Sequence, residues 1–398
     1  DYETVNFSTG TTAVNGAQTI DVVTVTPTAG GTSTLNLTGV NGLTTGIITA
    51  SVINASGLTG AAALTMGNAA AAGLTSITGS ANADILVGDA SSSISGGAGA
   101  DTITGGAGND TLLGGEGNDQ INPAAGNDSI DGGAGNDAIN LAANLTQADT
   151  VSGGEGTDAI LLTTAAFSAA NASNVSNFET LVLTHAQLAG DTTVTMTNFI
   201  ANTGFTNVVV NDNNGKVVTI ANASASLNTL GLGAGVGGDS VTFQRLIDTS
   251  TNALTLRTDG APGAAITAVI ASDEETITAT TTGVNGANVA TEITTLTAGD
   301  LRTLNIQGGA AYTITALAAA SISTINASGS TGAVTINTQG SAVNPLTVTA
   351  GTGGLTFSSG TAADTITGNV GNDNIWGWTG ADTINVGAGT DTLRYSAD

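Results

Sequence analysis

A nine-residue unit recurs between Gly96 and Asn140, and it restricts the fold more than any other feature of the chain. In one-letter code its first copies read GGAGADTIT, GGAGNDTLL and GGEGNDQIN. A degenerate copy begins at Pro123, and a complete one follows at Gly132. Each complete copy has three glycines before an aspartate and an Ile or Leu two residues after it. A short unit repeated in phase is typical of a solenoid.

The aspartates of this pattern keep a constant spacing in two separate runs. In the first run they are Asp101, Asp110, Asp119, Asp128 and Asp137, with weaker copies contributing Asp84 and Asp158. In the second run, where the glycines are more degenerate, they are Asp364, Asp373, Asp382 and Asp391. A flexible glycine-rich linker would not keep an apolar residue in phase with every aspartate. The pattern therefore predicts ordered structure in both runs. In the second run the degenerate glycines, together with Trp376 and Trp378, leave open that some turns are structural and bind no metal, but at least one ion is expected there.

The glycines and the aspartate together suit a turn that binds a cation. Adjacent glycines adopt positive φ at little cost, so the chain can turn tightly and direct its carbonyls inward. The three residues after the turn form a short strand with one buried side chain. Two such units make one coil, so repeats n and n+2 stack and their oxygens surround a hole. Calcium prefers about six to eight oxygen ligands and tolerates irregular geometry, whereas magnesium fits such a hole less well.

The predicted ligands of several calcium ions are aspartate carboxylates and the backbone carbonyls at the first and third repeat positions. The carboxylates are Asp84, Asp101, Asp110, Asp119, Asp128, Asp137, Asp158, Asp364, Asp373, Asp382 and Asp391, and the carbonyls are Gly96, Ala98, Gly105, Ala107, Gly114, Glu116, Gly132 and Ala134. Stacking should pair Asp101 with Asp119, Asp119 with Asp137, Asp110 with Asp128, Asp364 with Asp382 and Asp373 with Asp391. Because stacked carboxylates repel one another without metal, we expect calcium binding and folding to be coupled.

A longer repeat encloses the nonapeptides. The segment INASG occurs at 53–57 and at 325–329, and the same offset relates Asp101 to Asp373 and Glu3 to Glu275. Residues 273–398 therefore look like a second copy of 1–126. This predicts a β-rich module at 1–78, a β-roll at 79–161, a partial repeat at 162–272, a second β-rich module at 273–358 and a second roll at 359–398. Because the chain begins without Met, we expect it to be part of a longer polypeptide.

Composition supports an all-β fold and limits the partners. Only 3% of the residues are aromatic, so the core must consist of Val, Ile, Leu, Ala and Thr, most of which favour strands. We expect right-handed parallel β-roll or β-solenoid segments with calcium-binding GGxGxD turns, stacked with Thr- and Ala-rich β modules. Outside the nonapeptides the short alternating runs fit a solenoid or a sandwich equally well.

The charge balance argues against nucleic-acid and membrane partners. Five Lys and Arg face 31 Asp and Glu, a net charge of −26. Phosphate recognition needs clustered cations, and an anionic membrane would repel this surface. No run of 18 apolar residues is present, so we predict no membrane-spanning helix.

Enzymatic activity is not expected. His185 is the only histidine, cysteine is absent, and neither HExxH nor GxSxG occurs. The segment 233–238 fits GxGxxG formally, but the text after it resembles a strand, so we interpret it as a turn. A carboxylate pair for glycoside hydrolysis stays open. Strand-edge or calcium roles are preferred for the acids outside the rolls, such as Asp21, Glu179, Asp212, Glu274 and Glu275.

The nonapeptides resemble those of the RTX (repeats-in-toxin) family, whose consensus is GGxGxDxUx with U a large apolar residue. The strong resemblance covers about 79–161 and 360–393. It implies calcium-loaded parallel β-rolls and a protein that leaves a Gram-negative cell by type I secretion and folds outside. The family includes toxins, metalloproteases, lipases, adhesins and surface-layer proteins.

The residues around the rolls are similar to those of RTX surface-layer proteins of the Caulobacter type. The similarity lies in the Ala-, Thr- and Asn-rich β segments and in phrases such as FETL at 178–181. It implies a structural subunit at the cell surface that assembles with copies of itself into a two-dimensional lattice. Lipopolysaccharide would be bound through a region not in this chain. The alternatives are a segment of an RTX adhesin or surface filament, and the calcium-binding carrier part of a type I secreted enzyme.

Overall fold

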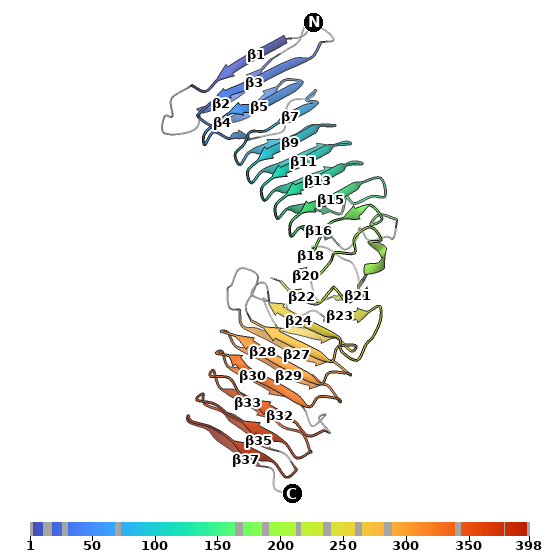
Figure 1. The fold of residues 1–398 in the computed structure, drawn as a ribbon, viewed down its shortest axis with the longest axis vertical. Coiled ribbons are helices and arrows are strands. Elements are labelled where there is room, and N and C mark those ends of the chain that lie inside the picture. Colours follow the sequence, from blue (N-terminus) through green and yellow to red (C-terminus); the bar gives the residue numbers. More distant parts are fainter. Residues whose placement is uncertain are drawn as a thin grey trace. The chain divides into compact units, whose positions relative to one another are not determined.

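The computed structural model describes residues 3–10, 18–25, 31–67, 73–163, 170–184, 191–211, 216–233, 240–258, 265–281, 289–338, 344–377 and 379–395. These residues form two compact units (Figure 1). Unit 1 comprises 1–182 and 198–205, and unit 2 comprises 183–197 and 206–398. Within the described ranges, no helix has the length and apolar character needed to cross a membrane.

Unit 1 is built from two sheets of parallel strands. The odd-numbered strands are β1 (Glu3–Ser8), β3 (Ser33–Gly39), β5 (Val52–Leu58), β7 (Ser76–Thr78), β9 (Ser93–Ala98), β11 (Thr111–Glu116), β13 (Ser129–Ala134), β15 (Thr150–Glu155) and β17 (Val175–Ser176). The even-numbered strands are β2 (Gln18–Thr24), β4 (Leu43–Thr49), β6 (Leu64–Met66), β8 (Ile85–Val87), β10 (Thr102–Ala107), β12 (Gln120–Ala125), β14 (Ala138–Ala142) and β16 (Ala159–Thr163). β18 (Thr180–Thr184) crosses the division between the units.

Unit 2 repeats this organisation. Its odd-numbered strands are β19 (Thr192–Thr195), β21 (Val217–Ala223), β23 (Ser240–Arg245), β25 (Ile266–Ile270), β27 (Thr291–Thr297), β29 (Tyr312–Ala318), β31 (Val334–Asn337), β33 (Leu355–Ser358), β35 (Asn374–Gly377) and β37 (Thr392–Tyr395). Its even-numbered strands are β20 (Asn207–Asn211), β22 (Thr229–Leu232), β24 (Ala253–Thr258), β26 (Thr276–Thr280), β28 (Thr303–Gly308), β30 (Thr324–Ser330), β32 (Thr347–Thr349), β34 (Thr365–Thr367) and β36 (Thr383–Asn385). A single 3₁₀ turn, Met196–Asn198, accompanies the described strands.

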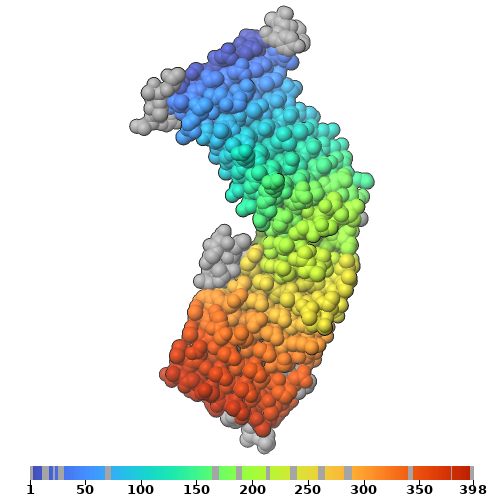
Figure 2. Space-filling view, in the orientation of Figure 1, coloured from blue at the N-terminus to red at the C-terminus, as the bar shows by residue number. Residues whose placement is uncertain are grey.

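The pairing of the strands identifies both units as parallel β-solenoids. Each strand pairs in parallel with the strand two positions along the chain, as β10 does with β12 and β26 with β28. The intervening strand and its turns supply the crossover that a parallel pair requires. Neighbouring coils are therefore also neighbours in sequence, and the colours within each unit of Figure 2 follow one another in bands. The all-β prediction is confirmed, and the described segments outside the nonapeptides are solenoid rather than sandwich.

A thin apolar row lies inside each roll. Ile103 stacks on Ile121 in the next coil, and both side chains are buried, as is Leu112 on the opposite strand. The apolar residue two positions after the aspartate is thus buried in every repeat except the last two, as the sequence predicted. The last described coil is more open, because Leu393 in β37 is 44% exposed.

The turns use glycine where the backbone demands it. The second and fourth repeat positions have positive φ, for example 118° at Gly115 and 117° at Gly117. L-residues rarely adopt this conformation, which explains the glycines at these two positions. In the degenerate copy Ala124 takes the second position and still adopts a φ of 70°.

The long-range repeat is visible in local structure. Asn54 Oδ1 accepts a hydrogen bond of 3.1 Å from the Ser56 N–H, and Asn326 Oδ1 accepts one of 3.1 Å from the Ser328 N–H. In both segments the register shifts relative to the preceding strand of the sheet, between β3 and β5 and between β28 and β30. The two copies of INASG thus fold alike, while the predicted module boundaries stay predictions.

Candidate metal sites

A ladder of carboxylates follows one corner of unit 1, immediately before the even-numbered strands. The backbone N–H of Asp101 donates to Oδ1 of Asp119, that of Asp119 to Asp137, and that of Asp137 to Asp158, each at 2.8 Å. The same bond joins the Asp84 N–H to Asp101 Oδ1 at 2.7 Å. We call this series the first ladder.

A second ladder follows the other corner of the same roll, before the odd-numbered strands. The N–H of Ser92 donates to Asp110 Oδ1 at 2.6 Å, and that of Asp110 to Asp128 Oδ1 at 2.9 Å. The two ladders arise because successive nonapeptides turn the chain at alternate corners. Each aspartate therefore meets the aspartate two repeats away rather than its neighbour in sequence.

The second run of nonapeptides, in unit 2, repeats the arrangement. The Asp364 N–H donates to Asp382 Oδ1 and the Asp373 N–H to Asp391 Oδ1, both at 2.9 Å. The structure thus brings together all five pairs that the repeat spacing predicted. Whether each pair binds metal stays a prediction.

The second carboxylate oxygen is what makes these corners candidate metal sites. Among the described residues, seven aspartates have a buried Oδ2 with no hydrogen-bond partner: Asp101, Asp110, Asp119, Asp137, Asp158, Asp364 and Asp382. A buried carboxylate oxygen without a partner is unfavourable, and a bound cation would relieve this cost. Each of these oxygens is therefore a position where a metal ion would stabilise the fold.

Backbone carbonyls converge on the same positions. A Cβ atom added to Gly105 would lie 2.5 Å from Asp110 Oδ2 and 2.7 Å from the Pro123 carbonyl oxygen. At Gly114 it would touch Asp119 Oδ2 and the Gly132 carbonyl oxygen in the same way. The carboxylate of one repeat and the first-position carbonyl of the repeat two further along thus face a common point.

This donor set fits calcium. It consists of carboxylate and backbone carbonyl oxygens, which a hard cation such as calcium accepts. Within the described ranges, no three or more His, Cys, Asp or Glu side chains gather around a point. When bound, calcium would neutralise the carboxylates and hold two successive coils together.

Two of the predicted third-position carbonyls have a partner in the protein. The Glu116 carbonyl accepts a hydrogen bond from the Gly99 N–H, and the Ala134 carbonyl accepts one from the Gly117 N–H, both at 2.7 Å. A metal ion would have to use the second lone pair of these oxygens. Glu116 and Ala134, with Ala98 and Ala107, stay predicted ligands.

Two predicted carboxylates are already satisfied. Asp84 Oδ2 accepts hydrogen bonds from Ser80, at 2.6 Å from the backbone N–H and 3.0 Å from the hydroxyl. Asp373 Oδ2 accepts one of 3.2 Å from the Asn369 N–H. A cation would compete with these bonds, so Asp84 and Asp373 fit the metal prediction less well than the seven unpartnered aspartates.

The ladders have two members outside the predicted repeat: Asp149, which sequence reasoning missed, and Glu179, for which it favoured a strand-edge or calcium role. The Asp128 N–H donates to Asp149 Oδ1 at 2.7 Å, and the Asp158 N–H donates to Glu179 Oε2 at 2.8 Å. Asp149 does not fit the repeat spacing, because it lies 21 residues after Asp128, whereas Asp128 lies 18 residues after Asp110. Its position nine residues before Asp158 was the available signal. Asp149 Oδ2 is taken by the Thr146 N–H at 2.6 Å, so the protein itself completes this carboxylate.

Burial raises the pKa of the repeat aspartates of the two ladders in unit 1, from Asp84 to Asp137 and at Asp158. It raises the pKa of Asp101 to about 7, and that of Asp128 and Asp158 to about 6. Backbone hydrogen bonds to the carboxylates oppose this shift, while neighbouring ladder carboxylates add to it. Without metal, Asp101, Asp128 and Asp158 therefore keep a proton to higher pH than an exposed Asp does.

The raised pKa values predict opposite pH dependences with and without calcium. An exposed Asp has a pKa near 3.8, so the metal-free folded state holds protons that the unfolded chain releases between about pH 4 and 7. In chelator, the free energy of unfolding should therefore fall as pH rises through this window. Calcium affinity should instead rise with pH, because binding displaces those protons. Urea titrations and calorimetry at pH 4.5, 6 and 7.5 would test this, and two flat profiles would contradict it.

A glycine substitution should test the convergence of the ligands. Gly114→Ala would place a methyl group against Asp119 Oδ2 and the Gly132 carbonyl oxygen. We expect a loss of about 1–3 kcal/mol of stability and weaker calcium binding in the first ladder. Gly299→Ala is the matched control, because its nearest atom is the Ser272 carbonyl oxygen at 3.9 Å. Equal calcium affinity in both variants, measured by calorimetry, would refute the proposed geometry.

Several residues weighed for other roles lie outside the described ranges. They are His185, Asp212, Trp378 and the segment 234–238, and the side chain of Asp21 is likewise not described. The strand expected after the glycine-rich segment is present as β23, Ser240–Arg245.

Comparison with known protein families agrees with the ladders. The family described as the RTX calcium-binding nonapeptide repeat matches the chain in four copies, over residues 88–121, 124–143 and 358–393. These ranges contain six of the seven aspartates with an unpartnered Oδ2; only Asp158 lies beyond them. No curated protein matches the chain.

Proposed function

Because the chain carries RTX calcium-binding nonapeptide repeats, which are typical of secreted extracellular proteins, we propose that it is a structural surface-layer subunit stabilised by calcium. Copies of it would assemble into a two-dimensional lattice on the cell surface. The carrying observation is the set of seven buried, unpartnered carboxylate oxygens at the solenoid corners. A chain built in this way becomes rigid when it meets calcium.

Repeated polar rows on the sheets support the assembly part of the proposal. In unit 2 one threonine per coil occupies the same register position in six successive even-numbered strands: Thr276, Thr303, Thr324, Thr347, Thr365 and Thr383. All of these threonines are partly or fully exposed. An uncharged row that repeats with the coil spacing suits contact with an equally periodic surface, such as that of another copy.

The charge of the chain is consistent with assembly in calcium. A net charge of −26 would hold copies apart in the absence of cations. Calcium bound in the corners and between acidic surfaces lowers this repulsion. Contacts that do not close on themselves then propagate into sheets or fibres.

Negative-stain microscopy during a calcium titration would test the proposal. We expect single unfolded or partly folded chains in chelator and ordered sheets after calcium is added. Isolated filaments would instead favour a segment of an adhesin or surface filament. Single folded particles would favour the carrier part of a secreted enzyme, and either result would overturn the lattice proposal.

A further inference from the structure

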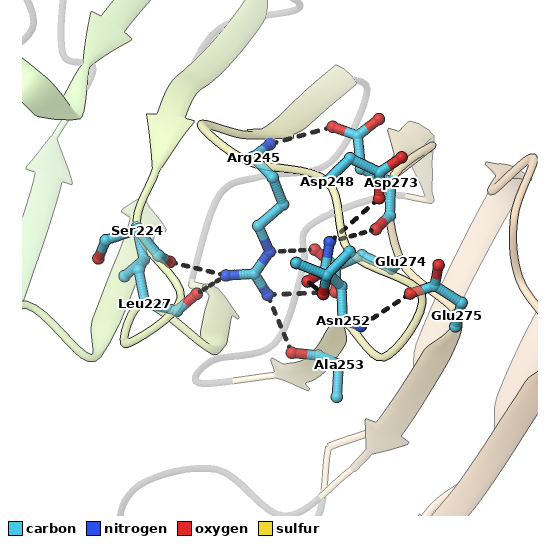
Figure 3. Close-up of polar contacts among 10 residues, drawn as sticks. Ser224, Leu227, Arg245, Asp248, Asn252, Ala253, Asp273, Glu274 and Glu275 are labelled. Carbon is cyan, nitrogen blue, oxygen red and sulfur yellow. Dashed lines mark hydrogen bonds and ion pairs between the residues drawn. The ribbon is translucent and has the colours of Figure 1, made fainter.

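Arg245, at the end of β23, is a buried cation inside unit 2. Its side chain is 3% exposed, and that of its ion-pair partner Glu274 is fully buried. The Nε–H donates to Glu274 Oε1 at 2.6 Å, and Nη2 donates to Glu274 Oε2 at 3.1 Å. Figure 3 shows the guanidinium pointing into a cage of oxygen atoms.

Backbone carbonyls complete this cage. Nη1 donates to the carbonyl oxygens of Ser224 and Leu227 at 2.8 and 2.5 Å, and Nη2 donates to that of Ala253 at 2.9 Å. All five N–H groups of the guanidinium are thus used. The acceptors are three carbonyls and one carboxylate, from the turns of three successive coils. This is the same kind of donor set that the calcium corners present.

The cage lies at the corner where the candidate calcium sites of unit 2 occur. The register of the even-numbered strands aligns Thr276 with Thr365 and Thr383 through the intervening coils. The residue before each of these threonines, Glu275, Asp364 or Asp382, therefore occupies one and the same corner of the solenoid.

The hydrogen bond that joins successive ladder aspartates, from a backbone N–H to the carboxylate of the next coil, also occurs at this corner. The Asn252 N–H donates to Glu275 Oε2 at 2.7 Å, just as the Asp364 N–H donates to Asp382 Oδ1. Glu275 thus takes the place of a ladder aspartate. This corner differs from the aspartate corners in its cation, because the guanidinium of Arg245 belongs to the chain and lies next to the carboxylates.

We propose that Arg245 replaces a calcium ion at this corner and makes the coils around it, residues 217–280, independent of calcium. The guanidinium satisfies the oxygen atoms of three successive turns, as an ion would in the rolls. Unlike an ion it cannot dissociate, so this part of unit 2 is complete before calcium is met. Strand-edge or calcium roles are predicted for Glu274 and Glu275, and in the structure their carboxylates accept hydrogen bonds from Arg245 and from the Asn252 N–H.

The surroundings hold Arg245 in one orientation. Its Cζ lies 4.9 Å from the ring centroid of the buried Phe243, and its backbone N–H donates to Asp273 Oδ2 at 3.0 Å. Asn252 links the same turn to Asp248 and to the Asp273 carbonyl, at 3.2 and 3.0 Å. A cation fixed in this way needs no rearrangement to organise the corner.

One consequence concerns the order of folding in unit 2. β24 and β26 belong to the same sheet as β34 and β36, next to which the unpartnered aspartates of unit 2 lie. The Arg245 coils would therefore offer a folded edge on which calcium-dependent coils can be added. In a solenoid, each coil needs only a folded neighbour to propagate.

Hydrogen–deuterium exchange of the whole chain, in chelator and in calcium, tests the proposal directly. We expect β23, β24 and β26 to stay protected in both conditions. Loss of their protection in chelator would overturn the proposal. The rolls at 84–161 and 364–393 report separately on the proposed calcium-dependent function: if they also stay protected in chelator, that function fails while the Arg245 proposal stands.

Removing the guanidinium provides a second test. Arg245→Ala leaves Glu274 and three carbonyls facing an empty space, so the corner should become calcium-dependent. We expect protection of β23 to be lost in chelator, restored by calcium, and accompanied by one more bound ion than in the unaltered chain. A variant that unfolds and is not rescued by calcium would overturn the replacement of calcium by Arg245.

Two further variants serve as controls. Arg245→Ala combined with Glu274→Ala removes the carboxylate too, so calcium should not restore protection and no extra ion should bind. Arg245→Lys keeps the charge but has too few donors for five acceptors, so partial protection without an added ion is expected. Calcium rescue of the double variant would place the binding elsewhere and contradict the proposal.

Discussion

Removing calcium is expected to unfold the rolls, with the larger effect in unit 1. Five of the seven unpartnered oxygens belong to unit 1 and two to unit 2. Calcium at a concentration of 100 times its dissociation constant contributes about 2.7 kcal/mol per ion, so one ion at each of the five oxygens would contribute about 13.5 kcal/mol. This is comparable to the whole stability of an ordinary domain, about 5–15 kcal/mol. The strands of residues 84–161 should therefore not persist in chelator at pH 7.5, where the ladder carboxyls have lost their protons.

Far-UV circular dichroism and thermal melts, with and without chelator, would measure this effect. We expect a large loss of β signal in chelator and full recovery when calcium is added. Magnesium should restore much less, because it prefers a smaller octahedral site and retains its waters. An unchanged β signal in chelator would mean that the aspartate corners are stable without metal.

Asp119 is the single side chain whose replacement should affect calcium binding most. Its Oδ1 accepts the Asp101 N–H at 2.8 Å, and its Oδ2 is buried without a partner. Asp119→Ala removes both functions, and because stacking places Asp119 between Asp101 and Asp137, we expect two adjacent ions to be weakened. Asp119→Asn can keep the bond to Asp101 and loses only the negative charge and one oxygen. Its calcium affinity should fall at least about tenfold, or about 1.4 kcal/mol, with a smaller loss of stability in chelator than in Asp119→Ala.

Calorimetric counting of bound ions would test both variants. Asp131→Asn is the control, because this carboxylate lies in the same roll but is exposed on β13. It should leave the number of ions unchanged. Loss of a single ion or none in Asp119→Ala would show that Asp119 does not serve two adjacent sites.

Much of the rolls could be predicted from the repeat alone. A period of nine with three glycines, an aspartate and one apolar residue allows few arrangements: glycine accepts positive φ, and the apolar residue must point inward. That reasoning identified the buried Ile103 and Leu112 and the pairing of Asp101 with Asp119. It also identified the oxygen-rich corners, since two repeats make one coil.

Outside the rolls, the sequence left solenoid and sandwich open, because short alternating strands suit both. Only the strand pairing decided between them, because each strand pairs in parallel with the strand of the next coil. Thr276 and Thr303 pair in the same way as Thr102 and Gln120, although no nonapeptide lies near them. The parallel coil therefore continues where its glycine–aspartate turns are lost.

The repeat spacing determined where the aspartates stand, but only the tertiary structure decided which of them need a cation. Asp84 and Asp119 occupy the same position of the repeat, yet a Ser80 hydrogen bond satisfies one, while the second oxygen of the other stays unpartnered. Arg245 shows the same limit: nothing in its neighbours along the chain predicts a cation at a solenoid corner. Its partners come from turns up to 29 residues away, and such contacts form only when the coils stack.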